Sequence, residues 1–431
     1  MNTYAVPRLI YLVLDGAADS IRDVKTSYEL ADKPNIDEIA RKSKGGMMYI
    51  LGRGIAPESD TAVFSLLGYN PYKYYTGRGP IEALGIGVSL RYDYEVAFRG
   101  NLATVDPKTR KIIDRRCGRD ISTDEAKELI KDLEYVDLGI YSGYAKTYVA
   151  ESYRVVVIIG SNKHMLSDNV SNVDPAYERR GKFSHSVRDY DPYIMNAEPM
   201  DKTAKSRITA ELVNKYVEHV INVLNEHPVN KRRIKSGKLP CNAILLRDAG
   251  MRPYGIPLFK HLHEFKMGAV VEMPVERGIA NLLGLAMAEV SPPSKDKSKD
   301  YPIRVDKVIK LLDYCDAVYV HLKGPDEPGH DRNLDAKVKA IEDIDRYFMK
   351  PLLDRINLDK TAFIITSDHA TPPSVGAHTD DPVPFIIYRP LMRGDGLSKF
   401  SEREVMNKGS LGVLDNAWTL LPIAKKIIWG I

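Results

Sequence analysis

Apolar, β-branched runs alternate with helical patterns toward both ends of this chain. Runs of this kind cover residues 8–14, 317–322 and 361–365, and apolar residues with helical spacing cover 305–314 and 335–348. Such alternation is typical of βαβ units, which build parallel sheets with helices on their faces. Because the pattern occupies the first ninety residues and returns after about residue 240, it predicts one parallel α/β sheet that is divided by an insertion.

The stretch between these parts has a different pattern. Short alternating stretches are separated by turns, a helix begins near Ser122 with an N-cap pattern, and a long amphipathic helix covers 203–226. The 431 residues also exceed one ordinary core. We therefore expect a discontinuous α/β domain of residues 1–90 and 235–431, and an inserted, smaller α+β domain of residues 91–234.

The composition excludes several classes of protein. A net charge of +4 is too small to indicate nucleic-acid binding. No apolar run approaches the roughly 20 residues that a membrane span needs, and the first residues lack the pattern of a signal peptide. Three widely spaced Cys form no CxxC pair, which favours a reducing compartment. We expect a cytoplasmic protein without nucleic-acid or membrane partners, and the oligomeric state stays open.

Acidic and imidazole side chains follow the predicted strands. The hexapeptide PDEPGH at 325–330 and the tripeptide SDH at 367–369 each come after an apolar run, and a serine stands where a helix is expected to begin, within ESDTA at 58–62. A single Asp or Ser in such a place is usually a turn or N-cap residue. The whole set is harder to explain in that way, and it gives these candidate ligands of a metal centre: Asp15, Ser59, Asp326, His330, Asp368, His369 and His378.

The ligand types indicate the chemistry. Ligands collect beyond the carboxyl ends of strands in open α/β sheets, so residues from distant parts of the chain are expected to meet there. Seven ligands are too many for one tetrahedral ion and fit two divalent ions, which clamp the oxygens of a transferring phosphoryl group. A serine beside such ions can act as a nucleophile. The spacing alone supports phosphoryl transfer, sulfuryl transfer or ester hydrolysis.

These motifs, in this order, resemble the metal and nucleophile set of the alkaline phosphatase superfamily. More narrowly, the chain resembles the archaeal-type 2,3-bisphosphoglycerate-independent phosphoglycerate mutases. The narrower likeness rests on TGRGPIEALGIG at 76–87, RGNLATVD at 99–106, DRRCGR at 114–119 and LSDNVSNVDP at 166–175. Three positions depart from the expected pattern: Tyr153 and Ala176 stand where histidine is expected, and Asp248 stands where glycine is commoner.

The resemblance implies an alkaline phosphatase-like core and an isomerase of glycolysis and gluconeogenesis. Such an enzyme interconverts 2-phosphoglycerate and 3-phosphoglycerate through a phosphoserine on Ser59, without 2,3-bisphosphoglycerate. The resemblance also implies one ion on Asp326, His330 and His378 and a second ion on Asp15, Ser59, Asp368 and His369. Manganese, cobalt, zinc and magnesium are all compatible with these oxygen and nitrogen ligands.

Basic residues are the candidates for holding a phosphoglycerate, because arginine binds carboxylate and phosphate through two parallel hydrogen bonds. Lys323 lies next to the metal motif, and Arg115, Arg116 and Arg119 form a cluster in the insertion, which is expected to bind the substrate. Arg78, Arg154 and Arg247 are weaker candidates. Runs of arginine are also common on solvated faces. Five histidines outside the motifs are expected to be ordinary surface or core residues: His164, His185, His261, His263 and His321.

Two other functions remain open at this stage. The first is another metal-dependent phosphomutase or a phosphomonoesterase of the same superfamily. A phosphomonoesterase would pass the phosphate to water and would need no domain that excludes water and holds glycerate. The second is a non-catalytic metal or phosphate sensor, for which a nucleophile at Ser59 would have no use.

Overall fold

The computed structural model describes residues 6–187, 189–292, 294 and 296–431. These residues divide into two units. The first contains the described chain up to Tyr75, Ile256–Glu276 and Ala280–Ile431, and the second contains Thr76–Gly255 and Arg277–Ile279. The chain therefore passes between the units at 75/76 and 255/256, whereas the sequence pattern placed the domain boundaries at 90/91 and 234/235.

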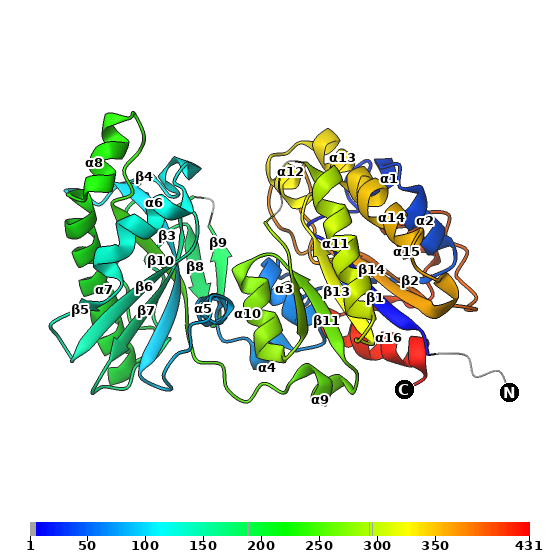
Figure 1. The fold of residues 1–431 in the computed structure, drawn as a ribbon, viewed down its shortest axis with the longest axis horizontal. Helices are drawn as coiled ribbons and strands as arrows, with labels where there is room; N and C mark the ends of the chain where they lie inside the picture. The colour runs from blue at the N-terminus through cyan, green and yellow to red at the C-terminus, as the bar shows by residue number, and fades with distance from the viewer. Residues whose placement is uncertain (1–5, 188, 293, 295) are drawn as a thin grey trace. The chain divides into compact units, whose positions relative to one another are not determined.

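A mixed β-sheet forms the centre of the first unit (Figure 1). In spatial order its strands are β12 (Ala286–Glu289), β11 (Met267–Val271), β13 (Ala317–Leu322), β1 (Arg8–Leu14), β14 (Thr361–Ser367), β15 (Val383–Tyr388), β2 (Lys44–Met48) and β16 (Val413–Leu414). The strands from β12 to β14 are parallel, as the alternation predicts. β15 runs antiparallel to β14, because a loop rather than a crossover helix joins the two strands.

The central strands carry the continuous apolar runs seen in the sequence. Every residue of β13 and β14, and every residue of β1 after Arg8, is buried. This is the pattern of parallel strands that are covered on both faces. The polar residues that follow these strands therefore stand at one edge of the sheet, where the apolar runs end.

Helices surround this sheet, and α11 packs on β11 and β13 while α15 packs on β2 and β15. The helices associated with the first unit are α1 (Ser27–Leu30), α2 (Pro34–Arg41), α3 (Ser59–Leu66), α4 (Pro71–Tyr74), α9 (Phe259–His263), α10 (Pro274–Leu283), α11 (Lys297–Leu312), α12 (Asp326–His330), α13 (Leu334–Ile344), α14 (Lys350–Leu353), α15 (Glu402–Lys408) and α16 (Leu420–Trp429), with short turns η3 (Asp345–Met349), η4 (Leu358–Lys360) and η5 (Ala417–Thr419).

The second unit is an α+β fold around an antiparallel sheet. The strand order is β10 (Ala243–Met251), β3 (Glu95–Val105), β7 (Arg154–Ser161), β6 (Gly143–Glu151) and β5 (Val136–Asp137), with β4 (Ile112–Asp114) beside β3 and a separate hairpin of β8 (Tyr177–Arg180) and β9 (Phe183–Ser186). The helices are α5 (Arg78–Gly85), α6 (Thr123–Ile130), α7 (Ala204–Asn225) and α8 (Pro228–Lys235), with short turns η1 (Cys117–Arg119) and η2 (Lys131–Leu133).

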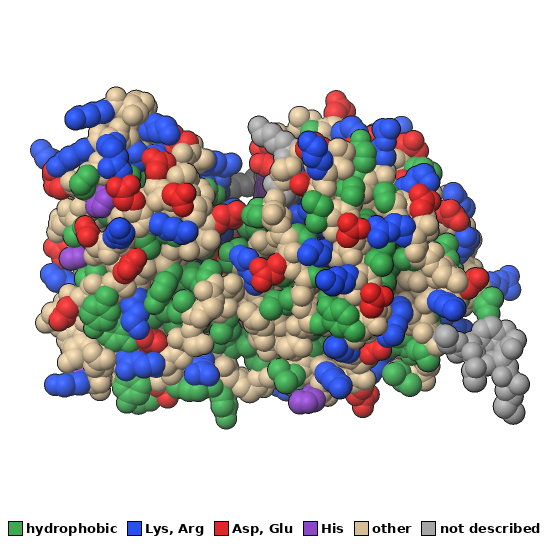
Figure 2. Space-filling view, viewed as in Figure 1, with side chains coloured by type: hydrophobic (Ala, Val, Ile, Leu, Met, Phe, Trp, Pro, Cys, Tyr) green, Lys and Arg blue, Asp and Glu red, His purple; other side chains and the backbone are tan. Residues whose placement is uncertain are grey.

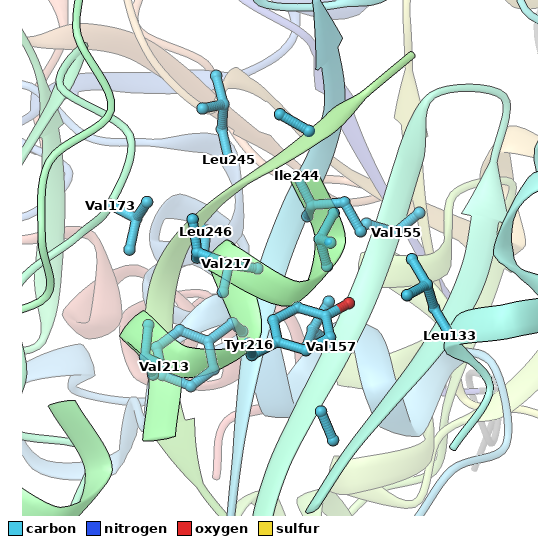
Figure 3. Close-up of a cluster of buried hydrophobic side chains, with 14 of the residues drawn as sticks. Leu133, Val155, Val157, Val173, Val213, Tyr216, Val217, Ile244, Leu245 and Leu246 are labelled. Atoms are coloured by element: carbon cyan, nitrogen blue, oxygen red, sulfur yellow. The ribbon is translucent and has the colours of Figure 1, made fainter. Parts of the chain in front are cut away.

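The amphipathic helix expected at 203–226 forms α7 and supplies much of the core of the second unit. Its apolar stripe, with Val213, Tyr216 and Val217, packs against Val157 of β7 and Leu246 of β10 (Figure 3). The Tyr216 hydroxyl is fully buried and lies 2.5 Å from the Thr147 hydroxyl, so its polar end is paired. Each buried aromatic or aliphatic side chain of this kind contributes roughly 1.5–3 kcal/mol.

Charged side chains are distributed over the surface of the protein. Lys, Arg, Asp and Glu side chains are interspersed over the face shown in Figure 2, as the net charge of +4 suggests. Within the described residues, no helix combines the length and the apolar character that crossing a bilayer requires.

Candidate metal and nucleophile site

Three neighbouring strands of the first unit bring the predicted ligands together. Leu14 of β1 is in register with Leu322 of β13 on one side and with Ser367 of β14 on the other. Asp15 therefore emerges beside the residues that follow β13 and β14. The Gly16 amide donates to Asp368 Oδ1 at 2.9 Å, which fixes the two strand ends relative to each other.

The first ligand group consists of Asp326, His330 and His378, whose ligand atoms lie within 4.8 Å of one another. Asp326 and His330 belong to the short helix α12, not to a loop as the sequence suggested, so their spacing of four residues places both side chains on one helical face. His330 Nε2 lies 3.4 Å from Asp326 Oδ2, and His378 Nε2 lies 3.5 Å from Asp326 Oδ1.

The second ligand group consists of Asp15, Asp368 and His369, all of them buried. His369 Nε2 lies 3.5 Å from Asp15 Oδ1 and 3.2 Å from Asp368 Oδ2. Asp15 Oδ1 and Asp368 Oδ2 are buried and accept no well-formed hydrogen bond within the described residues, so their partners are neighbouring imidazoles, as ion pairs. Buried carboxylates are costly unless a cation lies beside them, and a divalent ion suits these oxygens as ligands.

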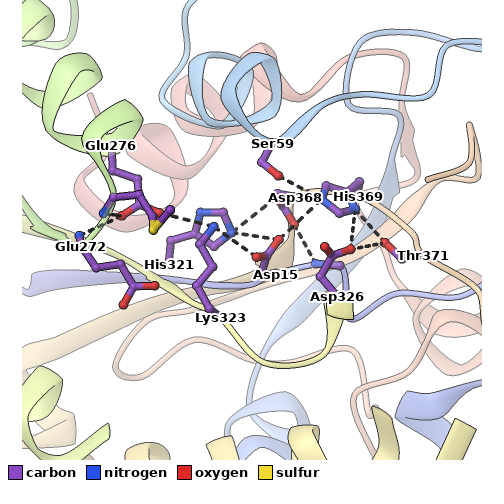
Figure 4. A network of polar contacts seen from close by, with 12 residues as sticks. Asp15, Ser59, Glu272, Glu276, His321, Lys323, Asp326, Asp368, His369 and Thr371 are labelled. Atoms are coloured by element: carbon purple, nitrogen blue, oxygen red, sulfur yellow. Dashed lines mark hydrogen bonds and ion pairs between the residues drawn. The ribbon is translucent and has the colours of Figure 1, made fainter. Parts of the chain in front are cut away.

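Ser59 is the first residue of helix α3 and points at the second group (Figure 4). Its Oγ lies 3.3 Å from His369 Nε2. The cap residue Glu58 makes no side-chain hydrogen bond to this helix. The positive end of a helix dipole favours a negatively charged group, so the start of α3 suits a phosphoryl group on Ser59.

The electrostatics of the second group favour ionised carboxylates. Burial alone would raise the pKa of Asp15, but the Lys323 ammonium and the neighbouring imidazoles outweigh burial and hold that pKa well below its ordinary value. Burial likewise opposes the charged form of His369, yet the Asp368 carboxylate raises its pKa well above the usual range. The imidazole must lose its proton to ligate an ion, so binding of an ion is expected to release protons.

His321 belongs to this site although the sequence gave no reason to include it. The ring lies on β13 with Nε2 3.3 Å from Asp368 Oδ2 and 3.7 Å from Asp15 Oδ1. Burial and the Lys323 ammonium lower the pKa of His321, but the carboxylates dominate and raise it to about 9. The expectation that His321 is an ordinary histidine is therefore wrong.

Lys323 reaches the same edge of the sheet, as its position next to the metal motif suggested. Its Nζ lies 3.1 Å from Asp15 Oδ2 and 3.3 Å from Glu276 Oε1. Glu276 caps the start of α10, where its Oε2 accepts from the amides of Glu272 and Met273. These carboxylates raise the pKa of Lys323 above its ordinary value against the effect of burial, so the side chain is a permanent cation.

The arginine candidates lie in the second unit, where two of them share one carboxylate. Arg115 Nε lies 3.1 Å from Asp174 Oδ1, and Arg247 Nη1 lies 3.1 Å from Asp174 Oδ2. Both guanidinium groups also stand over the Tyr177 ring. Asp248, where glycine is commoner, has φ +57°, a conformation that suits glycine and that aspartate tolerates better than most residues.

The remaining arginines differ in their surroundings. Arg154 forms an ion pair with Glu151 at 3.0 Å. Arg119 is exposed. Burial and neighbouring guanidinium groups lower the pKa of Arg116. Sequence reasoning overlooked Arg99, which is half-buried on β3 with its Nε 3.4 Å from Glu82 Oε1, the atom that also pairs with Arg78. The sequence RGN at 99–101 begins one of the motifs that resemble the mutase family, and this motif could have identified Arg99 as a candidate.

The fold and the site define a class: α/β proteins in which a serine at a helix start faces two groups of carboxylate and imidazole ligands at the ends of parallel strands. A family model described as 2,3-bisphosphoglycerate-independent phosphoglycerate mutase matches residues 40–230. A protein of that name from Aeropyrum pernix is 42% identical over 98% of this chain and 100% of its own length. The chain belongs to the family of 2,3-bisphosphoglycerate-independent phosphoglycerate mutases.

Solved structures agree with this assignment. A cofactor-independent phosphoglycerate mutase from Thermoplasma acidophilum is 30% identical, with a TM-score of 0.62 over 98% of this chain and 100% of that protein. A Pyrococcus horikoshii protein is 27% identical, with a TM-score of 0.74 over 98% of each chain. The α/β fold with an inserted α+β unit is thus shared along the whole length.

Proposed function

We propose that this protein interconverts 3-phosphoglycerate and 2-phosphoglycerate through a phosphoserine on Ser59, without 2,3-bisphosphoglycerate. Family membership supports the reaction. The observation that carries the proposal for this chain is the position of Ser59 at the start of α3, because its Oγ stands 3.3 Å from Nε2 of His369, a residue of the second ligand group.

The reaction balances without water or a second phosphate donor. Ser59 Oγ forms a bond to phosphorus, the bond between phosphorus and the 3-oxygen breaks, and the serine proton ends on that oxygen to give glycerate. The 2-hydroxyl then attacks the phosphoserine, its proton returns to Ser59, and 2-phosphoglycerate leaves. The helix start at α3 favours the phosphoryl group at this position throughout.

Two divalent ions are part of the proposal, and manganese, cobalt, zinc and magnesium all suit the ligands. Asp326, His330 and His378 would hold one ion, and Asp15, Ser59, Asp368 and His369 the other. When bound, such ions neutralise charge on the phosphoryl oxygens and favour the ionised serine. The buried oxygens of Asp15 and Asp368 support the second of these assignments.

Basic side chains are proposed to hold the rest of the substrate. Lys323, already a permanent cation at the sheet edge, is suited to a phosphoryl or leaving oxygen. For the carboxylate and the free glycerate we propose the guanidinium groups of Arg115, Arg116, Arg119, Arg154 and Arg247. Arg99 is added because its side chain is half-buried on β3 and its buried Nε makes no hydrogen bond within the described residues. Retention of glycerate is what separates a mutase from a phosphatase.

The test measures both products. Purified full-length protein is supplied with 3-phosphoglycerate alone, and 2-phosphoglycerate and free phosphate are followed with and without a chelator. We expect 2-phosphoglycerate as the main product, loss of activity with the chelator, and two ions per chain by elemental analysis. Free phosphate as the main product would show a phosphomonoesterase instead, and a single ion at full activity would refute the two-ion assignment.

Ser59→Ala is expected to lower turnover roughly a thousandfold or more, since it removes the nucleophile. The matched control is Ser65→Ala in the same helix, whose Oγ donates to the Ile50 carbonyl at 2.7 Å and makes no contact with the ligand groups. Mutase activity near that of the unmodified protein in Ser59→Ala would rule out the phosphoserine route.

A further inference from the structure

The hydroxyl of Thr371 stands between the two ligand groups. Thr371 Oγ1 donates to Asp326 Oδ1 at 2.8 Å, and it lies 3.0 Å from His369 Nδ1 (Figure 4). Asp326 belongs to the first group and His369 to the second. One side-chain oxygen therefore contacts a ligand of each group.

The direction of the two hydrogen bonds follows from the orientation of the His369 ring. Its Nε2 faces Asp15, Asp368 and Ser59, so this is the nitrogen that would ligate an ion. The neutral ring then carries its proton on Nδ1 and donates it to Thr371 Oγ1. The hydroxyl proton in turn points to Asp326. The three groups form a chain in which each proton has one acceptor.

The surrounding backbone holds Thr371 in this place. Its amide donates to the Ala18 carbonyl at 3.0 Å, and the fully buried Lys337 ammonium donates to the carbonyls of both Thr371, at 2.9 Å, and Ala18, at 3.0 Å. Helix α12 lies directly against the threonine, because a Cβ on Gly329 would come within 2.4 Å of the Thr371 carbonyl oxygen. Lys337 itself pairs with Asp19 at 2.6 Å.

We propose that Thr371 is a positioning residue that aligns His369 and Asp326 together and so strengthens the binding of both ions. The hydroxyl selects the His369 tautomer that leaves Nε2 free and fixes the Asp326 carboxylate toward its partners. The inference rests on the two-ion assignment of the proposed function. It differs from a merely structural role because the loss of one hydroxyl weakens the binding of two separate ions.

The test uses the full-length protein and Mn²⁺ as the probe, with calorimetric titration as the readout. In a His378→Ala background only the second group remains intact, and in an Asp368→Asn background only the first, so each gives a single-ion isotherm. Adding Thr371→Val, which removes the hydroxyl but keeps the branched shape, is expected to weaken Mn²⁺ binding about 10–100-fold in both backgrounds. Thr371→Ser keeps the hydroxyl and is expected to restore most of the affinity.

Two controls keep the result specific. Thr366→Val makes the same change on β14, where the Thr366 hydroxyl contacts the backbone carbonyls of Pro384 at 2.9 Å and Ser367 at 3.3 Å and not a ligand side chain, and it should leave Mn²⁺ binding unchanged. If Thr371→Val does not fold, as judged by thermal unfolding of the metal-free protein, Thr371→Ala serves as the hydroxyl-free variant because it introduces no extra atoms.

The outcomes are distinct. Weaker binding in both backgrounds with rescue by serine supports the proposal. Unchanged affinity, or a loss confined to one background, overturns it, since the hydroxyl would then not serve both groups. Absence of Mn²⁺ binding in the unmodified protein overturns the two-ion assignment itself, and it is recognised before any Thr371 variant is titrated.

Discussion

Gly16 offers a sharp test of how closely the strand ends are packed around the site. A Cβ built on Gly16 would lie 2.6 Å from Asp326 Oδ1 and 2.8 Å from Thr371 Oγ1. Ordinary van der Waals contact begins at 3.4 Å, so Gly16→Ala requires the Asp326 oxygen to move by 3.4 − 2.6 = 0.8 Å. Gly16 also has φ +58°, where a side chain adds roughly 1–2 kcal/mol of backbone strain.

The displacement and the strain have separate consequences. A shift of nearly an ångström at a ligand is expected to cost roughly 100-fold in turnover, because reacting groups tolerate little misplacement. The backbone strain lowers the free energy of unfolding and does not itself displace the side chains of the site. Gly396→Ala is the matched control, since Gly396 has φ +73° and no atom lies within 4 Å of its built Cβ.

The assays are mutase turnover, Mn²⁺ affinity and thermal unfolding, applied to both variants. Gly396→Ala is expected to lose only stability, by roughly 1–2 kcal/mol. Gly16→Ala is expected to lose at least as much stability, together with activity and Mn²⁺ affinity. If Gly16→Ala keeps normal turnover and ion binding while Gly396→Ala shows the same loss of stability, the packing at the strand ends does not control the site.

Two further predictions concern the second unit and the buried charges of the first. Arg119→Ala is expected to lower mutase flux about tenfold, which is the equivalent of a charge-assisted contact of roughly 1.5 kcal/mol. Free phosphate is expected to rise relative to 2-phosphoglycerate. An unchanged ratio of the two products would exclude a role for Arg119 in holding glycerate. Burial, and after it the Asp19 carboxylate, raises the pKa of Glu402 to about 7 in the folded protein. In the unfolded chain the same carboxyl group has its ordinary pKa of about 4.3. Between these two pH values the folded state holds a proton that the unfolded state has lost, so the free energy of unfolding should fall as pH rises. Thermal unfolding of Glu402→Gln across this range should lack that part of the decline, and identical pH profiles would refute it.

Much of the fold and of the ligand set is visible in the sequence because the same feature encodes both. A strand buried on both faces reads as an unbroken apolar run, and the first polar residues after it must lie at the sheet edge. Asp15, Asp326, Asp368 and His369 follow such runs directly or within a few residues. Each was therefore recognisable without knowledge of the strand order.

Other parts of the site lacked such a signal. His321 lies inside β13, where every residue is buried, so no alternation of polar and apolar residues marks it as different from a core histidine. Thr371 follows the ligands as an ordinary loop residue, and its role depends on contacts with Asp326, 45 residues earlier. Contacts of this kind come from the packing of the strand ends and not from local pattern.

Residues 69–87 are rich in Gly, Pro and Tyr, a composition that favours a loop, but they contain α4 and α5. Asn70 caps α4, and Pro71 occupies its first position, where proline is well tolerated. The glycine at position 79 is needed because a Cβ there would come within 2.3 Å of the Ala97 carbonyl of β3. Close packing of a helix on a strand, rather than a turn, explains this glycine.

The position of β1 has a consequence for the order in which the protein is assembled during synthesis. β1 lies between β13 and β14, and its Leu9 pairs with Ala317 and Ala362. Both partner strands are synthesised more than 300 residues after β1, so neither edge of β1 can form its hydrogen bonds before then. At roughly 5–20 residues per second this takes on the order of 15–70 seconds. The segment Thr76–Gly255 is continuous and contains the whole sheet of the second unit, so it emerges complete while β1 is still exposed. The apolar strand at the centre of the catalytic sheet is thus the part of the nascent chain that most needs protection from aggregation.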